Sequence, residues 1–153
     1  MNLIDTDILI GSLTIYGEAR GSSQDDRLAI AHTILNRCNA KKWWGEKVKP
    51  HPDHSIAAVC LKPYQFSCWN ANDPNSRLLA NLRTQYREAI KDKSCRAALK
   101  ALIDAVDGFE PDPTLGATHY VTTSLHKSSK APAWSKGKSF IEIGAHRFFA
   151  GVE

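Results

Sequence analysis

The sequence predicts a mainly helical α+β fold in a single domain, with a small β element near the C-terminus. Apolar residues recur at helical spacing through most of the first 107 residues. After the turn-rich segment 110–116, short runs of β-branched and aromatic residues replace that spacing. No repeat or Pro/Ser-rich linker divides the chain, so residues 1–153 are expected to form one domain.

Two helices are expected at the start of the chain. The first spans about residues 6–20, and Gly21 is expected to end it. The second begins at Ser22 or Ser23, because Ser23 and Asp26 have the spacing of a capping box with Asp in the usual place of Glu. The buried stripe of this second helix is predicted to consist of Leu28, Ala31, Ile34, Leu35 and Cys38.

The rest of the chain alternates loops with shorter elements. Residues 41–53 carry two tryptophans, two prolines and many charges, and are expected to form a surface loop. Further helices are predicted over about residues 55–61, 75–91 and 95–107. Strands are predicted at 119–123 and, as a hairpin with a tight Gly-Ala turn, at 140–143 and 146–149.

The charge of the chain points to an anionic partner. The formal net charge is +4, which suits nucleic acid or a bacterial wall. No cluster of Lys and Arg with interleaved aromatic residues is present, which argues against nucleic acid. No apolar run is long enough for a bilayer, so we expect no stable insertion into a membrane.

The cysteines do not form a metal-binding pattern. Cys38, Cys60, Cys68 and Cys95 are widely spaced and include no CxxC pair, so no zinc ribbon is expected. We expect thiols that pack like small apolar groups, with one disulfide left open as an alternative in an oxidising compartment. No metal or other cofactor is predicted.

Glu18 is the strongest candidate for chemistry. It lies in Tyr16-Gly-Glu-Ala-Arg-Gly, at the C-terminal end of the first predicted helix. A carboxyl group there meets the negative pole of the helix and, if it is partly buried, a low dielectric, and both raise its pKa. A carboxyl that stays protonated near neutral pH is what a general acid requires. The alternative is a solvated Glu18 that pairs with Arg20.

The motif around Glu18 is followed by further distinctive blocks. They are Leu28-Ala-Ile-Ala-His-Thr-Ile-Leu-Asn-Arg, Tyr64-Gln-Phe-Ser, Asp104-Ala-Val-Asp-Gly, Pro111 to Gly116 with Ala117-Thr-His-Tyr, Pro132-Ala-Trp, and Ile143-Gly-Ala-His-Arg-Phe-Phe. Their content and order resemble the cell-wall hydrolase family typified by the spore-cortex-lytic enzyme SleB. The resemblance covers nearly the whole chain.

This resemblance implies both a fold and an activity. The family is similar in fold to the catalytic domains of goose-type lysozyme and soluble lytic transglycosylases. The implied reaction is cleavage of the bond from N-acetylmuramic acid to N-acetylglucosamine in peptidoglycan, with Glu18 acting first as acid and then as base. In a transglycosylase the muramoyl 6-hydroxyl attacks in place of water and leaves a 1,6-anhydro end. We expect a monomer whose partner is the glycan strand.

A second catalytic carboxylate is not evident. Ordinary glycosidases need two carboxylates, and no candidate lies in a motif that fixes it beside Glu18. The candidates are Asp25, Asp26, Asp73 and Glu142. Intramolecular attack dispenses with a base-activated water, so a transglycosylase is favoured over a hydrolase.

Six further residues are predicted to bind substrate. They are Asn36, Gln65, His119, Tyr120, Trp134 and His146. The two amides would hold N-acetyl or hydroxyl groups, the tyrosine and tryptophan would offer flat faces to sugar rings, and the histidines would line the cleft. The alternatives are capping for the amides, core packing for the aromatic residues and a purely structural role for the histidines.

Two other functions stay open. A zinc-dependent wall amidase or peptidase would use His119, His126 and His146 with a carboxylate, although no HExxH spacing is present. A non-catalytic peptidoglycan-binding module would leave Glu18 inert and bind through Trp43, Trp44 and the positive charge.

The biological setting is predicted from the layout of the chain. The apolar stretch from Ile8 to Ile15 lacks a basic leader and a cleavage site, so no signal peptide is expected. A short member of this family without an export signal or a separate wall-binding domain is typical of a bacteriophage endolysin. We therefore expect it in the host cytoplasm before lysis, and at the bacterial cell wall after a holin opens the membrane.

Overall fold

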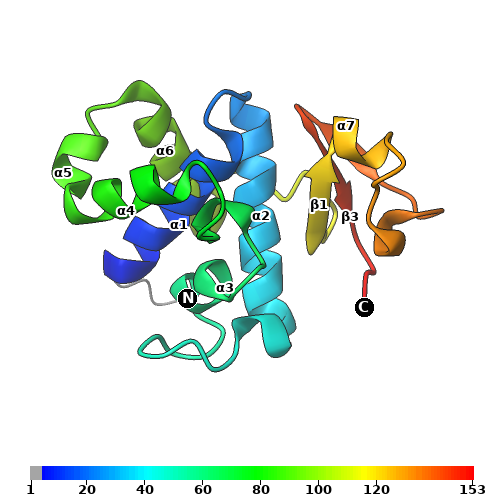
Figure 1. Cartoon of the computed structure of the whole chain (residues 1–153), viewed down its shortest axis with the longest axis horizontal. Helices are drawn as coiled ribbons and strands as arrows, with labels where there is room; N and C mark the ends of the chain where they lie inside the picture. The colour runs from blue at the N-terminus through cyan, green and yellow to red at the C-terminus, as the bar shows by residue number, and fades with distance from the viewer. Residues whose placement is uncertain (1–4) are drawn as a thin grey trace.

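The computed structural model describes residues 5–153 as a group of helices beside a small sheet (Figure 1). The helices are α1 (Asp5–Ala19), α2 (Gln24–Ala40), α3 (Ile56–Leu61), α4 (Ser76–Thr84), α5 (Tyr86–Ala89), α6 (Lys93–Asp107) and α7 (Thr123–His126). The strands are β1 (His119–Thr122), β2 (Ile141–Ile143) and β3 (His146–Phe149), and short 3-10 turns lie at Trp43–Gly45, Ser67–Trp69 and Ala133–Ser135. Figure 1 shows α2 standing between α1 and the sheet.

Local signals explain where the main helices begin and end. Ser23 caps α2 by accepting a hydrogen bond from the backbone N–H of Asp26 at 3.2 Å, which confirms the predicted start. The carboxylate of Asp26 does not complete the capping box, because it turns toward the sheet instead. Asp92 caps α6 in the same way, and Gly108 ends this helix in the left-handed conformation.

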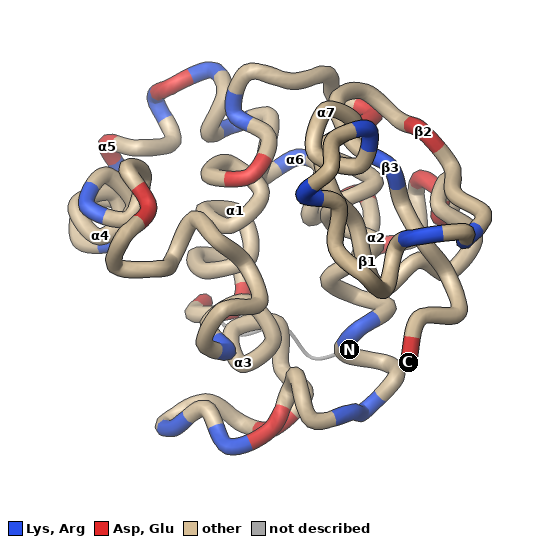
Figure 2. The backbone as a smooth tube through the Cα atoms, turned by 45° about the vertical axis from the view of Figure 1, so that its right-hand side comes forward, with Lys and Arg blue, Asp and Glu red and all other residues tan. Residues whose placement is uncertain are grey.

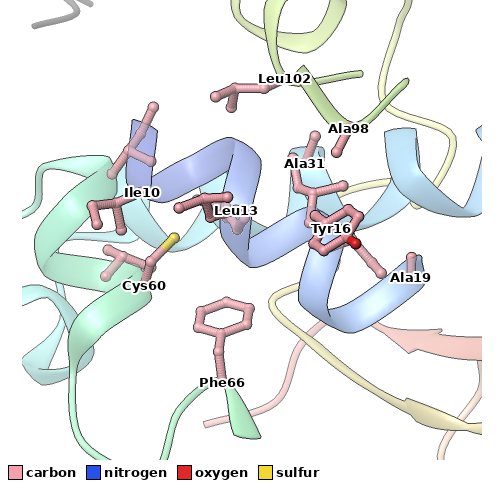
Figure 3. Close-up of a cluster of buried hydrophobic side chains, with 14 of the residues drawn as sticks. Ile10, Leu13, Tyr16, Ala19, Ala31, Cys60, Phe66, Ala98 and Leu102 are labelled. Atoms are coloured by element: carbon pink, nitrogen blue, oxygen red, sulfur yellow. The ribbon is translucent and has the colours of Figure 1, made fainter. Parts of the chain in front are cut away.

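The core lies where α1 packs against α2, α3 and α6. Figure 3 shows side chains from these helices meeting around the middle of α1, with Phe66 closing the cluster. The labelled residues are Ile10, Leu13, Tyr16, Ala19, Ala31, Cys60, Phe66, Ala98 and Leu102, all of them buried. All four cysteines are buried free thiols, as expected for thiols that pack as small apolar groups. This packing fixes the C-terminal end of α1, which carries Glu18.

The sheet is antiparallel, with strand order β1-β3-β2. The predicted hairpin is confirmed as β2 and β3, joined at Gly144, whose φ is +57°. The strand predicted at 119–123 is β1, and it pairs with the other edge of β3, with Tyr120 opposite Phe148. This pairing brings Tyr120 and His146 into the same part of the sheet.

Two predictions about the middle of the chain are wrong in part. The segment 41–53 is not wholly a surface loop, because Trp44 is only 1% exposed and its indole donates to the carbonyl of Arg37 at 3.0 Å. The helix predicted over 75–91 is broken into α4 and α5, because Gln85 between them has a non-helical backbone (φ −127°). None of the helices in the described part combines the length and hydropathy needed to cross a bilayer.

Candidate active site

A cleft of about 240 Å³ lies between the helices and the sheet. Five segments line it: the end of α1, α2, the segment that follows α3, β1 with α7, and β3. Figure 2 shows β1 and α7 facing α1 and α3 from the other side of the molecule. The lining residues are Glu18, Arg37, Tyr64, Gln65, Ser67, Tyr120, Val121, Thr122, Leu125 and His146.

Glu18 is half-buried at the cleft, one residue before the end of α1. Burial raises the pKa of this carboxyl from 4.5 to about 7, because the charged form loses its hydration. Weaker effects come from four neighbours: His146, Tyr120 and the Ser67 backbone lower the pKa, and Asp73 raises it. Glu18 therefore holds a proton over much of the neutral range, as a general acid must.

The expected alternative partner of Glu18 is engaged elsewhere. The guanidinium of Arg20 is 3.4 Å from the side-chain oxygen of Asn75 and lies over the ring of Tyr16 at 5.4 Å. Arg20 is exposed, so its charge is largely screened by water. Among residues 5–153, no cation is bonded to this acid in the cleft.

Tyr120 places an unused hydroxyl beside Glu18. Its oxygen is buried and has no well-formed hydrogen bond within residues 5–153, yet it lies close enough to the Glu18 carboxyl to lower the pKa of that group. Burial, with the nearby charge of Glu18, raises the pKa of Tyr120 well above 10. The phenol thus keeps its proton and is a donor ready for a Glu18 carboxylate.

His146 is held by a buried carboxylate. Its Nδ1 lies 2.9 and 2.8 Å from the two oxygens of Asp26, whose side chain also accepts from the Ala145 backbone N–H at 3.2 Å and from the Ser22 hydroxyl. Asp26 is fully buried and His146 is 5% exposed. With Nδ1 used in this way, Nε2 remains as the second polar atom of an imidazole that lines the cleft.

Arg37 is a site residue that sequence reasoning missed. Its Nε donates to the carbonyl of Thr118 at 2.6 Å, and one Nη donates to the side-chain oxygen of Gln65 at 3.0 Å. The guanidinium also stacks near the rings of Trp44 and Phe66. The hydrogen bond from Arg37 fixes the orientation of the Gln65 amide. Arg37 is the last residue of the sequence block that begins at Leu28, and this position was the signal that could have indicated a role in the site.

Three of the six predicted substrate-binding residues line the cleft: Gln65, Tyr120 and His146. Asn36 does not, because its amide donates to the Asp112 carboxylate and to the Ala117 carbonyl, both at 2.9 Å. These two hydrogen bonds hold the 112–117 loop against α2. Asn36 therefore has the capping role that was predicted as the alternative to substrate binding.

His119 and Trp134 also lie outside the cleft lining. The ring of His119 packs edge-on against Trp44 at 5.7 Å and Trp134 at 5.0 Å, and Trp134 packs against Phe149 at 5.3 Å. Burial, with the charges of Arg37 and Lys42, lowers the pKa of His119 to about 4. These residues form an aromatic support for β1 behind the cleft.

None of the candidate second carboxylates lines the cleft with Glu18. Asp26 is used by His146, Glu142 is exposed and bonds Arg147 at 2.9 Å, and Asp25 is exposed on α2. Asp73 accepts from the Asn75 backbone N–H at 2.8 Å. Over residues 5–153, Glu18 is the single carboxylate of the cleft.

The histidines considered as zinc ligands have separate surroundings. His126 lies 2.9 Å from an Arg147 nitrogen and packs against Phe140, away from the Asp26–His146 pair. In the described part of the chain, no three His, Cys, Asp or Glu side chains are grouped to hold a metal ion.

Comparison with known proteins places the chain in a family. The profile of the cell wall hydrolase family matches residues 21–149. The chain belongs to the cell wall hydrolase family. The match begins just after Glu18, so the choice of Glu18 as candidate acid rests on its geometry in the cleft and on the resemblance of the motif around it.

Two curated relatives of this cell wall hydrolase are spore cortex-lytic enzymes. The one from Bacillus subtilis (strain 168) is 28% identical over 145 residues, covering 94% of this chain and 37% of the relative. The one from Halalkalibacterium halodurans is 28% identical over 144 residues, covering 94% and 34%. The chain thus spans about a third of the length of these relatives.

Two solved structures share the fold. The catalytic domain of the germination-specific lytic transglycosylase SleB from Bacillus anthracis has a TM-score of 0.65 at 24% identity, covering 97% of this chain and 98% of that one. The catalytic domain of the Bacillus cereus SleB protein has a TM-score of 0.62 at 24% identity, covering 97% and 93%. The predicted fold class, α+β and mainly helical with a small sheet near the C-terminus, is confirmed.

Proposed function

We propose that the protein cleaves the β-1,4 bond from N-acetylmuramic acid to N-acetylglucosamine in peptidoglycan, as a lytic transglycosylase with Glu18 as its acid and base. The observation that carries this proposal is one protonated carboxyl, with a pKa of about 7, in a cleft where no other described carboxylate stands. Family membership supports the polymer, and the neighbouring structure from Bacillus anthracis is named for the same reaction.

The first step uses the proton of Glu18. As the bond from the muramoyl C1 to the glycosidic oxygen breaks, its electron pair goes to that oxygen, which takes the proton. Positive charge builds at C1 while Glu18 becomes a carboxylate. The Tyr120 hydroxyl then gains a charged acceptor, and a hydrogen bond to an ionised group is stronger than one to a neutral group. This stronger hydrogen bond forms as the transition state is reached and is weaker in the ground state. It therefore lowers the activation barrier of the reaction.

The second step returns the proton to Glu18. The carboxylate accepts the proton of the muramoyl 6-hydroxyl, whose oxygen forms a bond to C1 and closes the 1,6-anhydro ring. No water is consumed, so no second carboxylate is needed to activate one. The absence of another carboxylate from the described cleft lining therefore favours the transglycosylase over a hydrolase.

Two neighbours are placed to orient the sugar. The Gln65 amide, fixed by Arg37, and the His146 imidazole, fixed by Asp26, line the cleft with polar groups in set directions. Groups held by buried partners lose little freedom when substrate binds, which lowers the cost of reaching the reactive geometry. We assign them positioning roles.

Mass spectrometry of the soluble products from purified peptidoglycan tests the proposal. Wild type is expected to release anhydromuramoyl products, and Glu18→Gln to release none, since the amide cannot deliver a proton. Glu88→Gln is the matched control, because Glu88 is an exposed glutamate on α5 and its loss should leave the products unchanged. Reducing muramoyl ends would identify a hydrolase, and full activity of Glu18→Gln would overturn the role of this acid.

The same experiment separates the other functions. A zinc amidase or peptidase would release peptides rather than muramoyl ends and would stop when a chelator is added. A non-catalytic peptidoglycan-binding module would retain the wall polymer without releasing fragments. Either result would replace the proposed reaction.

We propose, from the sequence reasoning alone, that the physiological role is that of a bacteriophage endolysin. The protein would stay in the host cytoplasm until a holin opens the membrane. Expression in a bacterial host with and without a holin tests this: lysis is expected only when the holin is present. Lysis without a holin, or a gene set among chromosomal sporulation genes, would contradict it.

A further inference from the structure

Tyr64 stands out among the aromatic residues of the cleft because it faces water. It is 85% exposed, more than any other large apolar residue that is exposed in the described chain. It follows α3 and forms part of the cleft lining that contains Glu18. An aromatic ring left in water at the edge of a cleft has no role in the core and leaves its flat face open to a ligand.

The backbone at Tyr64 is equally unusual. The N–H of Gln65 donates to the carbonyl of Lys62 at 3.1 Å, which closes a turn with Pro63 and Tyr64 in its centre. Tyr64 has a φ of +66°, as the third position of a type II turn requires, and glycine is the residue favoured there. A bulky residue in this conformation is strained, and strain of this kind gathers at sites that hold ligands.

A second hollow lies next to Tyr64. It measures about 260 Å³ and is formed by residues 61–64 and 69–71. Tyr64 belongs to the lining of both this hollow and the catalytic cleft. Tyr64 is therefore the residue that the linings of the two depressions have in common.

The walls of the second hollow suit a neutral, amphipathic ligand. Pro63 and Trp69 supply apolar surface, and Asn70 supplies an amide. The one cation, Lys62, has its ammonium group bonded to the carbonyl of Glu46 at 2.7 Å, and the indole N–H of Trp69 is bonded to Thr14 at 2.8 Å. A pyranose ring has this mixed character, with C–H faces that pack on aromatic rings and hydroxyls that bond to amides.

We propose that Tyr64 is a stacking platform that carries the glycan strand from the catalytic cleft into this hollow, which is a second saccharide subsite. The inference rests on the proposed cleavage of a glycan and adds where a neighbouring sugar of the strand lies. The exposed ring and its strained backbone are then explained together, because the turn keeps the Tyr64 side chain out of the core and in the lining of both depressions.

Substitutions at Tyr64 separate binding from stability. Tyr64→Gly removes the ring and relaxes the backbone, so we expect an equal or higher Tm, and kcat/KM for long glycan strands lower by roughly tenfold, the order expected for loss of one good aromatic contact. The loss should be much smaller for the shortest cleavable fragment, which cannot reach the second hollow. Tyr64→Phe keeps the flat face and should retain most of the activity on long strands.

Leu115→Gly is the matched control. Leu115 is also exposed (78%) and also has a positive φ of +55°, but it does not line the cleft or the second hollow. Its replacement should raise or keep Tm and leave cleavage of long strands unchanged. Tyr64→Gly that cleaves long strands as well as wild type does, or that loses the same factor on long and short substrates, would overturn the platform.

A binding measurement keeps this test independent of the reaction. Retention of Glu18→Gln on long glycan strands is compared with that of Glu18→Gln carrying Tyr64→Gly or Tyr64→Phe. Weaker retention with Gly but not with Phe supports the platform even if wild type releases no muramoyl products, a result that would overturn only the proposed reaction. Equal retention of all three proteins would overturn the stacking role of Tyr64 and would leave the proposed reaction unaffected.

Discussion

At the scale of single residues, Glu18 shows how catalysis and stability oppose each other. The burial that keeps its carboxyl protonated near neutral pH also makes its charged form costly. The folded protein holds this proton up to about pH 7, whereas the unfolded chain releases it near pH 4.5. The unfolding free energy contributed by Glu18 therefore falls as pH rises through this interval.

Replacing Glu18 with glutamine should stabilise the protein at alkaline pH. One pKa unit corresponds to about 1.4 kcal/mol, so the gain of Glu18→Gln over wild type should reach about 3 kcal/mol at pH 8 and nearly vanish at pH 4. Urea unfolding at both pH values measures it. Glu88→Gln, at an exposed position, should change little at either pH. A gain for Glu18→Gln that is the same at pH 4 and pH 8 would show that its pKa is not raised.

At the scale of elements, the β2–β3 turn is fitted onto the start of α2. Gly144 has a φ of +57°, and a Cβ there would lie 2.6 Å from the Cβ of Asp26. The next residue donates its backbone N–H to the Asp26 carboxylate, and His146 follows on β3. The turn thus holds the Asp26–His146 pair at the cleft, which is why Asp26 serves the sheet rather than completing its own capping box.

Gly144→Ala should therefore damage both stability and activity. The strained φ and the clash with Asp26 together should lower the unfolding free energy by about 3 kcal/mol, and His146 should shift in the cleft. Gly137→Ala is the control, since Gly137 has a similar φ of +71° but open space around it and should lose only about 1 kcal/mol. Chemical unfolding and the release of wall fragments measure the two effects. Equal losses of unfolding free energy in both variants would show that the close approach of Gly144 to Asp26 does not constrain this turn.

At the scale of the whole molecule, positive charge gathers beside the sheet. The segment from α7 to β2 carries four exposed lysines and no acid before Glu142, and Figure 2 shows these basic segments on the loops beside α7 and β1. The lysines are Lys127, Lys130, Lys136 and Lys138. We expect this face to attract an anionic wall over the cleft.

Replacing these four lysines with glutamine should weaken cleavage of intact walls. The effect should fade as NaCl rises from about 50 to about 300 mM, because salt screens charges separated by more than the shortened Debye length. Cleavage of short, uncharged fragments should change little. The control replaces four exposed basic residues in the region from α4 to the start of α6, Arg83, Arg87, Lys91 and Lys93. If both quadruple variants lose the same activity on walls, the net charge matters and its place does not.

Much of the fold was predictable because its signals are local. Ser23 and Gly108 mark helix ends through their own backbone and side-chain chemistry, and the Gly144 step marks a hairpin. The errors arose where distant packing decides. Trp44 is buried because Arg37 and His119 lie against it, and no pattern within residues 41–53 records those contacts.

The sequence by itself determined the family and most of the helical and strand segments, and it singled out the candidate acid, because spacing, capping residues and the motif around Glu18 are properties of neighbouring positions. Only the tertiary structure decided what surrounds that acid. Asp26 and His146 are 120 positions apart along the chain, and Arg37 meets Gln65 from another element. Such contacts also set the pKa of Glu18, place Tyr64 in the lining of two depressions and keep Asn36 out of the cleft. They form only when the helices and the sheet pack together.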